Sequence, residues 1–258
     1  MAENLDMLTE VFELEVGYKD ENGVVHKEVE IRDMTGFDEE LFAKAENRQN
    51  MGKFITTVLS TLVVRIGDLT PKEVGKTKWT KIFQNLHLGD RDKIMMEIRK
   101  LANGDEIELE VKCPTCKSQL KHVVEMDVDI EHRPLKVDPN GFEFELPKGV
   151  KNKEGKLCKK GIIRLPNGQD QEILANIAVK NAGMANTHLL QRTIVSLEGF
   201  EQKEINLNLI RKMTSKDRTY LLELLAENSF GPNLELEITC PNCGGDIERV
   251  GVHPVNFL

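Results

Sequence analysis

Two nearly identical segments carry the residues best suited to chemistry, "EVKCPTCKS" (110–118) and "EITCPNCGG" (237–245). Each places two cysteines three residues apart around a proline, at the end of an alternating apolar run. A tight turn of this kind points both thiolates in one direction, because its backbone amides face the sulfur atoms. Tetrahedral zinc takes four ligands at about 2.3 Å, so each segment supplies half a site. The four cysteines are Cys113, Cys116, Cys240 and Cys243.

No other residues complete either half within its own copy. His122 lies six residues after Cys116, but the matching position in the second copy is Arg249. His253 has no well-placed partner in the first copy, and Cys158 stands alone. The economical prediction is a zinc-ribbon-like site with one zinc per chain, shared by both pairs around a pseudo-twofold axis. Four protein ligands leave no open position, so this zinc would be structural.

Three alternatives remain open for these cysteines. A C-x-x-C pair in a reducing compartment is also typical of a redox dithiol, although that chemistry needs a thioredoxin-like βαβ context and one reactive pair. The cysteines are alternatively the reduced remnants of an ancestral zinc ribbon. Finally, each pair could belong to a separate site that a partner chain or a histidine completes.

Composition bounds the class of protein. The chain has 258 residues, of which 40% are hydrophobic and 30% charged, enough for a packed core. The formal net charge of −8 and the aromatic content of 5% argue against nucleic acid and anionic lipid as partners. No signal peptide is apparent, and the most apolar run, Phe54 to Val64, is too short to span a bilayer. We expect a soluble intracellular protein with mostly reduced cysteines and no membrane partner.

The chain reads as two copies of one unit. Cys113 and Cys240 lie 127 residues apart, and this offset matches nine of the 27 positions over residues 90–116. Unrelated sequences would match at about one or two. A Pro-containing segment between the copies is typical of a linker. The predicted divisions are a first unit at 1–132, a linker at 133–141 and a second unit at 142–258.

Further upstream the offset between the copies becomes 132. There "IRDMTGFDEELFAK" from Ile31 matches "IRLPNGQDQEILAN" from Ile163. At the start of each unit, "FELEV" (12–16) aligns with "FEFEL" (142–146). The changes of offset fall between these blocks, where loops are expected.

Each unit is predicted to contain the same elements. A β-hairpin comes first, because apolar and polar residues alternate on both sides of the Asn22-Gly23 turn. In the first unit "TPKE" (70–73) supplies an N-cap, a first-turn proline and a capping-box glutamate. The predicted longer helices are Asp38–Arg48, Lys53–Arg65, one from near Asp90 to just before Gly104, and its counterpart after Thr214.

A second hairpin, tipped by the cysteine pair, closes each unit. In the first unit its outgoing strand is predicted over "LKHVVEMDVDI" (120–130). The fold class is therefore α+β, with an internally duplicated unit of hairpin, helices and CPxC-tipped hairpin.

Nothing in the sequence indicates catalysis. The Asp-Arg pairs at 90–91 and 217–218 begin helices, where an aspartate complements the helix dipole and an arginine can brace a neighbouring loop. The six histidines are scattered and unmatched between the copies. Phosphate-binding loops, nucleophile elbows and metalloprotease motifs are absent from the sequence. We therefore predict a protein that is not an enzyme.

The pattern resembles the baseplate hub and baseplate-assembly proteins of contractile-tailed bacteriophages. Those proteins combine a β-hairpin, an acidic helix and an apolar helix with a "D-R"-initiated helix that leads into a CPxC tip. The segments that carry the resemblance are "IRDMTGFDEELFAK" from Ile31, "DRDKIMMEIRKLANGDEIELEVKCPTC" from Asp90 and "DRTYLLELLAENSFGPNLELEITCPNC" from Asp217. The chain departs from the family at Lys117-Ser118, where a glycine is usual after the second cysteine. We expect looser amide geometry at this tip than at Gly244-Gly245.

The resemblance implies a non-enzymatic structural or assembly protein of a phage tail baseplate. Its partners would be other tail and baseplate proteins, with copies of itself as a further candidate. It would lie in the host cytoplasm during assembly, and in the virion tail if it is retained there. The alternative is a nucleic-acid-binding zinc-ribbon accessory protein, for which "KGVKNKEGKLCKK" (148–160) would supply six lysines. A dithiol oxidoreductase is the third hypothesis.

Overall fold

Alternating side chains around Asn22-Gly23 form the first β-hairpin, as predicted. In the computed structural model, which describes residues 8–44 and 48–252, the hairpin pairs antiparallel and continues into a third strand. Gly23 sits at the turn with φ +85°, a conformation that glycine adopts without steric cost. The strands of this sheet, in spatial order, are β1 (Thr9–Lys19), β2 (Val25–Arg32) and β3 (Val63–Ile66).

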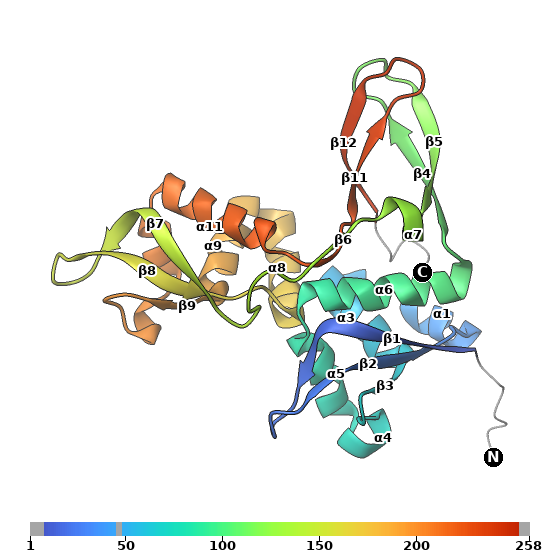
Figure 1. Ribbon diagram of the computed structural model, residues 1–258, viewed down its shortest axis with the longest axis horizontal. Helices are drawn as coiled ribbons and strands as arrows, with labels where there is room; N and C mark the ends of the chain where they lie inside the picture. Colours follow the sequence, from blue (N-terminus) through green and yellow to red (C-terminus); the bar gives the residue numbers. More distant parts are fainter. Residues whose placement is uncertain (1–7, 45–47, 253–258) are drawn as a thin grey trace.

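Helices cover this sheet and complete the first lobe, at the lower right of Figure 1. They bury one apolar cluster between sheet and helices, centred on α3 and α6. The helices are α1 (Gly36–Phe42), α3 (Met51–Leu62), α4 (Pro71–Val74), α5 (Lys76–Asn85) and α6 (Leu88–Asn103).

Two of the predicted helix boundaries are wrong. The helix predicted over Lys53–Arg65 ends at Leu62, and the residues after it form β3 on the edge of the sheet. The β-branched Val63 and Val64 favour the extended strand over the helix. The helix predicted over Asp38–Arg48 begins two residues earlier and ends at Phe42, and residues 45–47 of that prediction lie outside the described part of the chain.

The capping signals are confirmed. Thr70 and Glu73 form the predicted capping box, with Pro71 in the first turn of α4. Helix α6 begins at Leu88 and ends directly before Gly104, which has φ +81°. No described helix is both long and apolar enough to cross a bilayer.

The second lobe, at the left of Figure 1, repeats this arrangement with its own apolar core. Its sheet has the order β7 (Phe142–Lys151), β8 (Leu157–Ile163) and β9 (Ile194–Leu197). Helix α11 follows Thr214, which caps it, as predicted. The helical elements are α8 (Gly168–Lys180), α9 (Ala182–Thr193), η1 (Gln202–Glu204), α10 (Leu207–Lys212) and α11 (Ser215–Glu227).

An aspartate near the start of the last helix holds the first strand of each sheet. The carboxylate of Asp90 accepts hydrogen bonds from the Glu15 amide at 2.9 Å and the Gly17 amide at 2.8 Å. The carboxylate of Asp217 accepts from the amides of Lys148, at 2.7 Å, and Gly149. These amides lie where the strand pairing shifts register, so each buried aspartate satisfies backbone donors that the sheet leaves free.

Both lobes also tie the hairpin to the following helix by an arginine–aspartate pair. Arg32 and Asp38 are 2.7 Å apart, and Arg164 and Asp170 are 2.7 Å apart. Asp170 is fully buried and accepts a second ion pair from Arg192, also at 2.7 Å.

Arg91 joins the two lobes. Its guanidinium is fully buried and donates to the carbonyl oxygens of Phe83 and Gly52 and to the hydroxyl of Thr56 within the first lobe. It also donates from Nε to Oε1 of Gln171 on α8, at 3.2 Å. Burial lowers the pKa of Arg91 to about 10, so the side chain is charged at neutral pH. The predicted bracing role is thus a bracing of one lobe against the other.

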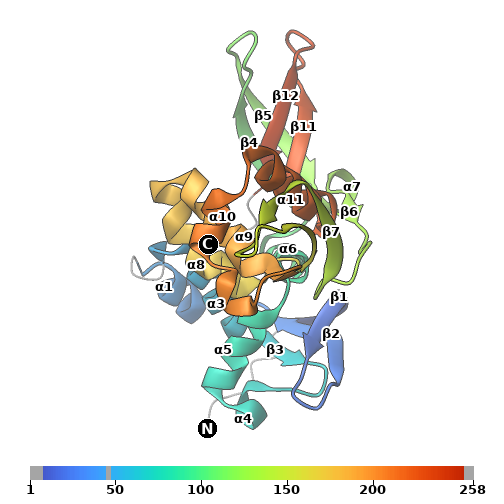
Figure 2. The ribbon, with the colours of Figure 1, turned by 90° about the vertical axis from the view of Figure 1, so that its left-hand side faces the viewer.

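The two CPxC hairpins leave their lobes and stand side by side as an arm, at the top of Figures 1 and 2. Two small apolar clusters pack within the arm, one at its base and one below the cysteine tips. The outgoing strand of the first hairpin ends at Glu125, earlier than predicted, because a short helix follows it. The elements are β4 (Glu106–Lys112), β5 (Gln119–Glu125), α7 (Met126–Asp129), β6 (His132–Arg133), β10 (Gly231–Pro232), β11 (Glu235–Thr239) and β12 (Asp246–Gly251).

We predict that Asp170→Asn destabilises the protein by about 3 kcal/mol at neutral pH, because two arginines lose a buried counter-charge. Burial alone would raise the pKa of Asp170, but the hydrogen bond and charge of Arg164 outweigh it and hold the pKa below the usual 3.8. The stabilisation is therefore present above about pH 4 and is lost as the pH falls further. Denaturant unfolding over a pH series measures both effects.

The control for this substitution is Glu198→Gln. Glu198 pairs with Lys156 at the exposed edge of the second lobe, so its removal should leave the unfolding free energy unchanged. Equal stability of Asp170→Asn and the wild type at pH 7 would contradict the role given to the buried pair.

Candidate metal centre

The two CPxC tips have the same backbone geometry. At the first tip the Cys113 amide donates to the Ser118 carbonyl at 3.0 Å, and the Lys117 amide donates to the Cys113 carbonyl at 3.1 Å. At the second tip the Cys240 amide donates to the Gly245 carbonyl at 2.9 Å, and the Gly244 amide donates back to Cys240 at 2.8 Å. The expectation of looser amides at the first tip is therefore wrong.

Lys117 makes this equivalence possible by adopting an unusual conformation. Its φ is +63°, and it is the one non-glycine residue with positive φ in the described chain. Gly244 occupies the corresponding position with φ +69°. The turn dictates a left-handed residue at this point, and the first tip meets the requirement with a lysine despite the steric cost.

All four predicted cysteines come together at the end of the arm. Their sulfur atoms lie within 4.8 Å of one another. The pairs across the two hairpins are reciprocal, with 3.7 Å from Cys113 to Cys243 and 3.7 Å from Cys116 to Cys240. The edge of a tetrahedron with metal–sulfur bonds of about 2.3 Å is about 3.8 Å. A disulfide needs about 2.05 Å, so the sulfurs are spaced as four separate ligands.

The tips bury one sulfur of each pair and leave the other open. Cys113 and Cys240 are buried, whereas Cys116 and Cys243 are exposed. The two tips touch across the cluster, since a Cβ added to Gly245 would lie 2.9 Å from the Thr115 hydroxyl. Four sulfurs in this arrangement enclose a space that is closed on the hairpin side and reachable from solvent at the tip.

The electrostatics of the cluster favour a positive ion at its centre. The hydroxyl and amide of Ser118 lower the pKa of Cys116 to about 6. At Cys243 the Gly245 amide favours the thiolate, but contact with the sulfur of Cys116 outweighs it and raises the pKa to about 12. Once one thiolate has formed, its neighbours resist ionisation, and a bound cation removes this repulsion. The cluster could therefore hold a metal ion.

The other candidate ligands lie elsewhere. His122 is on β5, one of the residues that pair with β4, and is not part of the sulfur cluster. Cys158 is buried in the second lobe, where its thiol donates to the Lys156 carbonyl. His253 lies outside the described residues. Ser118, whose hydroxyl is 3.0 Å from the Cys116 sulfur, was not predicted, and the missing glycine at this tip was the available signal.

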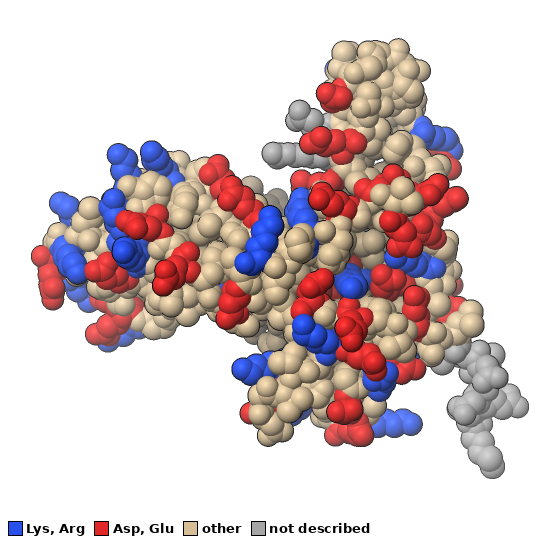
Figure 3. Space-filling view, in the orientation of Figure 1, with Lys and Arg blue, Asp and Glu red and all other residues tan. Residues whose placement is uncertain are grey.

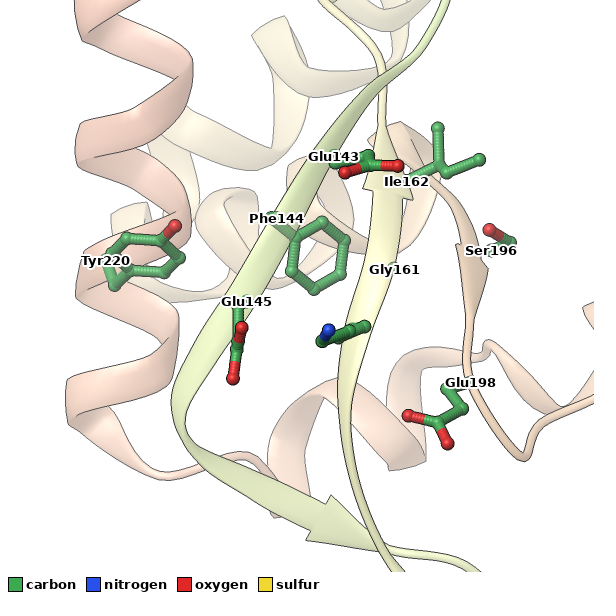
Figure 4. A pocket seen from close by; sticks show the side chains of 9 residues that line it. Glu143, Phe144, Glu145, Gly161, Ile162, Ser196, Glu198 and Tyr220 are labelled. Atoms are coloured by element: carbon green, nitrogen blue, oxygen red, sulfur yellow. The ribbon is translucent and has the colours of Figure 1, made fainter.

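A hollow of about 600 Å³ on the second lobe is the other concave region of note (Figure 4). It lies over β7 and β8, with Tyr220 of α11 on one side and Glu198 on the other. Glutamates and a lysine line it together, and among the described residues no group of three metal-ligating side chains gathers there. The sulfur cluster is the stronger candidate for a functional site.

We predict that Lys117→Gly stabilises the protein by about 1 kcal/mol, because glycine adopts the left-handed conformation without steric cost. The matched change, Gly244→Ala at the second tip, should destabilise it by a similar amount. Equilibrium unfolding of the two variants beside the wild type gives both values. A loss of stability in Lys117→Gly would show that its side chain, whose Nζ donates to the Pro114 carbonyl, contributes more than the strain costs.

Comparison with known proteins agrees with this geometry. The family model described as "T4 bacteriophage base plate protein" matches residues 13–246, which include both lobes and all four clustered cysteines. Searches of curated proteins and of solved structures give no significant match. The match covers most of the chain, so the chain belongs to the family of T4 bacteriophage base plate proteins.

Proposed function

We propose that this chain is a non-enzymatic structural or assembly protein of a contractile phage tail baseplate, and that one structural zinc staples its two halves together. The family match supports a structural role in the tail. The observation that carries the rest is the group of four sulfurs, drawn from hairpins 127 residues apart in the chain. Other tail and baseplate proteins are its proposed partners.

The proposed ligands are the residues predicted from the sequence, Cys113, Cys116, Cys240 and Cys243. Four thiolates in tetrahedral spacing are the ligand set of zinc or of iron–sulfur centres. Separations of 3.7 Å between paired sulfurs leave room for a single ion and none for a multi-iron cluster. Zinc with four protein ligands has no open position, which agrees with a structural role.

We further propose that the chain is an internal duplication, divided at 1–132, 133–141 and 142–258. The two sheets share one strand order, and each has a register shift in its first strand. Gly17 and Gly149 lie in these shifts with φ +79° and +84°, each beside the aspartate of the last helix. This correspondence has an offset of 132, so the alignment of residues 12–16 with 142–146 is displaced by two positions. The twofold applies to the hairpins, whose sulfur contacts are reciprocal.

The nucleic-acid alternative receives less support. Within the lysine-rich segment 148–160, Lys153 pairs with Glu204 and Lys156 pairs with Glu198. Acidic and basic side chains are interspersed over the face shown in Figure 3, and no continuous basic stripe crosses it. Binding to phosphate needs unpaired cations in such a stripe.

We predict one zinc per chain in protein purified without added metal, and none in the double variant Cys240→Ser, Cys243→Ser, because two ligands cannot retain the ion. Elemental analysis measures this content. The control is Cys158→Ser, which changes a buried cysteine far from the cluster and should keep one zinc. Two zincs, or one that survives the double variant, would contradict a shared site.

The same variants test the biological role. A phage that lacks this gene should fail to make complete tails, and the wild-type gene or Cys158→Ser supplied in trans should restore them. The double variant should restore few or none, because the two hairpins separate without the metal. Normal tails in the absence of the gene would overturn the proposed function, whereas full rescue by the double variant would overturn only the role of zinc.

A further inference from the structure

The contact between the lobes is formed by a glycine-bearing helix face. Helix α3 of the first lobe receives the first turn of α8 so closely that a Cβ on Gly52 would lie 2.6 Å from the backbone of Glu172. Asn50 donates its amide to the Glu172 carbonyl at 2.7 Å, and Thr56 donates its hydroxyl to the Glu172 carboxylate at 2.6 Å. Gln84 donates to the same carboxylate at 2.9 Å.

Arg91 and the start of α8 complete the contact. Nε of Arg91 donates to Gln171, and a Cβ on Gly168 would lie 2.3 Å from the Arg91 guanidinium. The Gly168 amide donates to the Leu86 carbonyl at 3.0 Å. The face on the first lobe is therefore a receptor for the start of a helix, and its specific atoms are satisfied by that helix.

The second lobe carries the same receptor face. Arg218 donates to the Thr187 hydroxyl at 2.8 Å and to the Gly183 carbonyl at 3.4 Å, as Arg91 does to Thr56 and Gly52. Asn181 caps α9 as Asn50 caps α3. The residues of this second face, at offsets of 131 or 127 from the first, are Asn181, Gly183, Thr187, Arg211 and Arg218.

Within the described chain nothing occupies this second face. A Cβ on Gly183 would meet only its own Asn181, at 3.4 Å. A glycine inside a helix costs about 1 kcal/mol relative to alanine, and here no neighbour explains it. Nε of Arg218 is buried without a hydrogen-bond partner among the described residues, whereas Nε of Arg91 has Gln171. The face has the features of the first receptor without its ligand.

The counterpart of the α8 ligand is equally exposed. Helix α1 corresponds to the start of α8 at an offset of 132, with Gly36 at the position of Gly168. A Cβ on Gly36 would meet nothing within 4 Å. Glu39 and Glu40 stand in place of Gln171 and Glu172, and both are exposed.

Charge makes the two exposed surfaces complementary. In the occupied contact, Arg91 meets the neutral Gln171, and the neutral Gln84 meets Glu172. In the exposed pair, Arg218 would face Glu39 and Arg211 would face Glu40, so each contact gains a charged partner. Charge-assisted hydrogen bonds of this kind are stronger than neutral ones.

We propose that helix α1 of a second copy of this chain docks on the α9–α11 face of the first, in the manner of α8 on α3. This rests on the equivalence of the two lobes proposed above. One chain cannot make the contact with itself, because α1 lies in the first lobe and α9 in the second (Figure 1). The contact is head-to-tail, so each added copy presents a new free face, and the copies form a ring or an open row.

The test uses the full chain and variants that disable one surface at a time. Gly183→Gln fills the open space over α9 and improves the helix propensity, so it should fold as the wild type does. Glu39→Lys with Glu40→Lys reverses the charge of α1 at exposed positions. The control is Val179→Gln, a change at a side chain that is 90% exposed on α8 and outside the proposed contact.

Sedimentation equilibrium over a concentration series gives the mass. The wild type and Val179→Gln should rise above 29.3 kDa as concentration increases, and association should weaken in high salt. Each disabling variant alone should remain at 29.3 kDa, with association at least roughly tenfold weaker. Mixed together, the two should form a one-to-one dimer and nothing larger, since each retains the surface that the other has lost.

Three results would overturn the proposal. These are a wild type that stays monomeric at every concentration, a Gly183→Gln protein that associates as the wild type does, and a mixture that fails to pair. The zinc content of each sample, measured in parallel, separates these results from a failure of the proposed metal site. A wild type that is monomeric but contains one zinc would leave the proposed staple intact and assign the face to a different protein.

Discussion

The four sulfur atoms at the tip of the arm are the constraint on which the arrangement of the two halves depends. Two-stranded hairpins are marginally stable on their own, and the apolar clusters inside the arm are small. The sulfurs lie far from both lobes, at the ends of hairpins that start in different lobes. A bond network at that point closes a loop of more than 120 residues, and so restricts the unfolded chain far more than a local contact would.

A second constraint acts at the base of the arm, where α6 begins. Asp90 accepts the amides of the first sheet, and its neighbour Arg91 reaches across to Gln171 in the second lobe. Two adjacent buried charges thus hold a sheet and a lobe interface at once. Each is surrounded by hydrogen-bond partners, which offsets the cost of taking it out of water. The arm tip and this joint together fix the lobes at two widely separated points.

Local signals in the sequence predicted much of this structure. The Asn22-Gly23 turn, the Thr70–Glu73 capping box and the two CPxC tips depend on neighbouring residues, so their geometry is legible without the fold. The cysteine spacing also predicted the site, because only one arrangement of two half-sites gives four ligands. The metal itself remains a proposal, as does the duplication.

Other features depend on contacts between distant segments and could not be predicted. The edge strand β3 exists because Val63 pairs with Ile31, whereas its apolar run alone resembles a helix. The role of Arg91 depends on Gln171, which lies 80 residues later in the chain. The match between the Gly52 and Gly183 faces went unseen because its offset of 131 falls between the blocks that align at 132 and 127. Spatial equivalence revealed what the alignment of short motifs had missed.

X-ray absorption at the zinc edge on the purified chain is the measurement that tests the central claim most directly. The account predicts a first shell of four sulfur atoms at about 2.3 Å and no nitrogen or oxygen neighbour. A mixed shell, with nitrogen at about 2.0–2.1 Å, would contradict it, because a histidine would then have replaced one of the four cysteines.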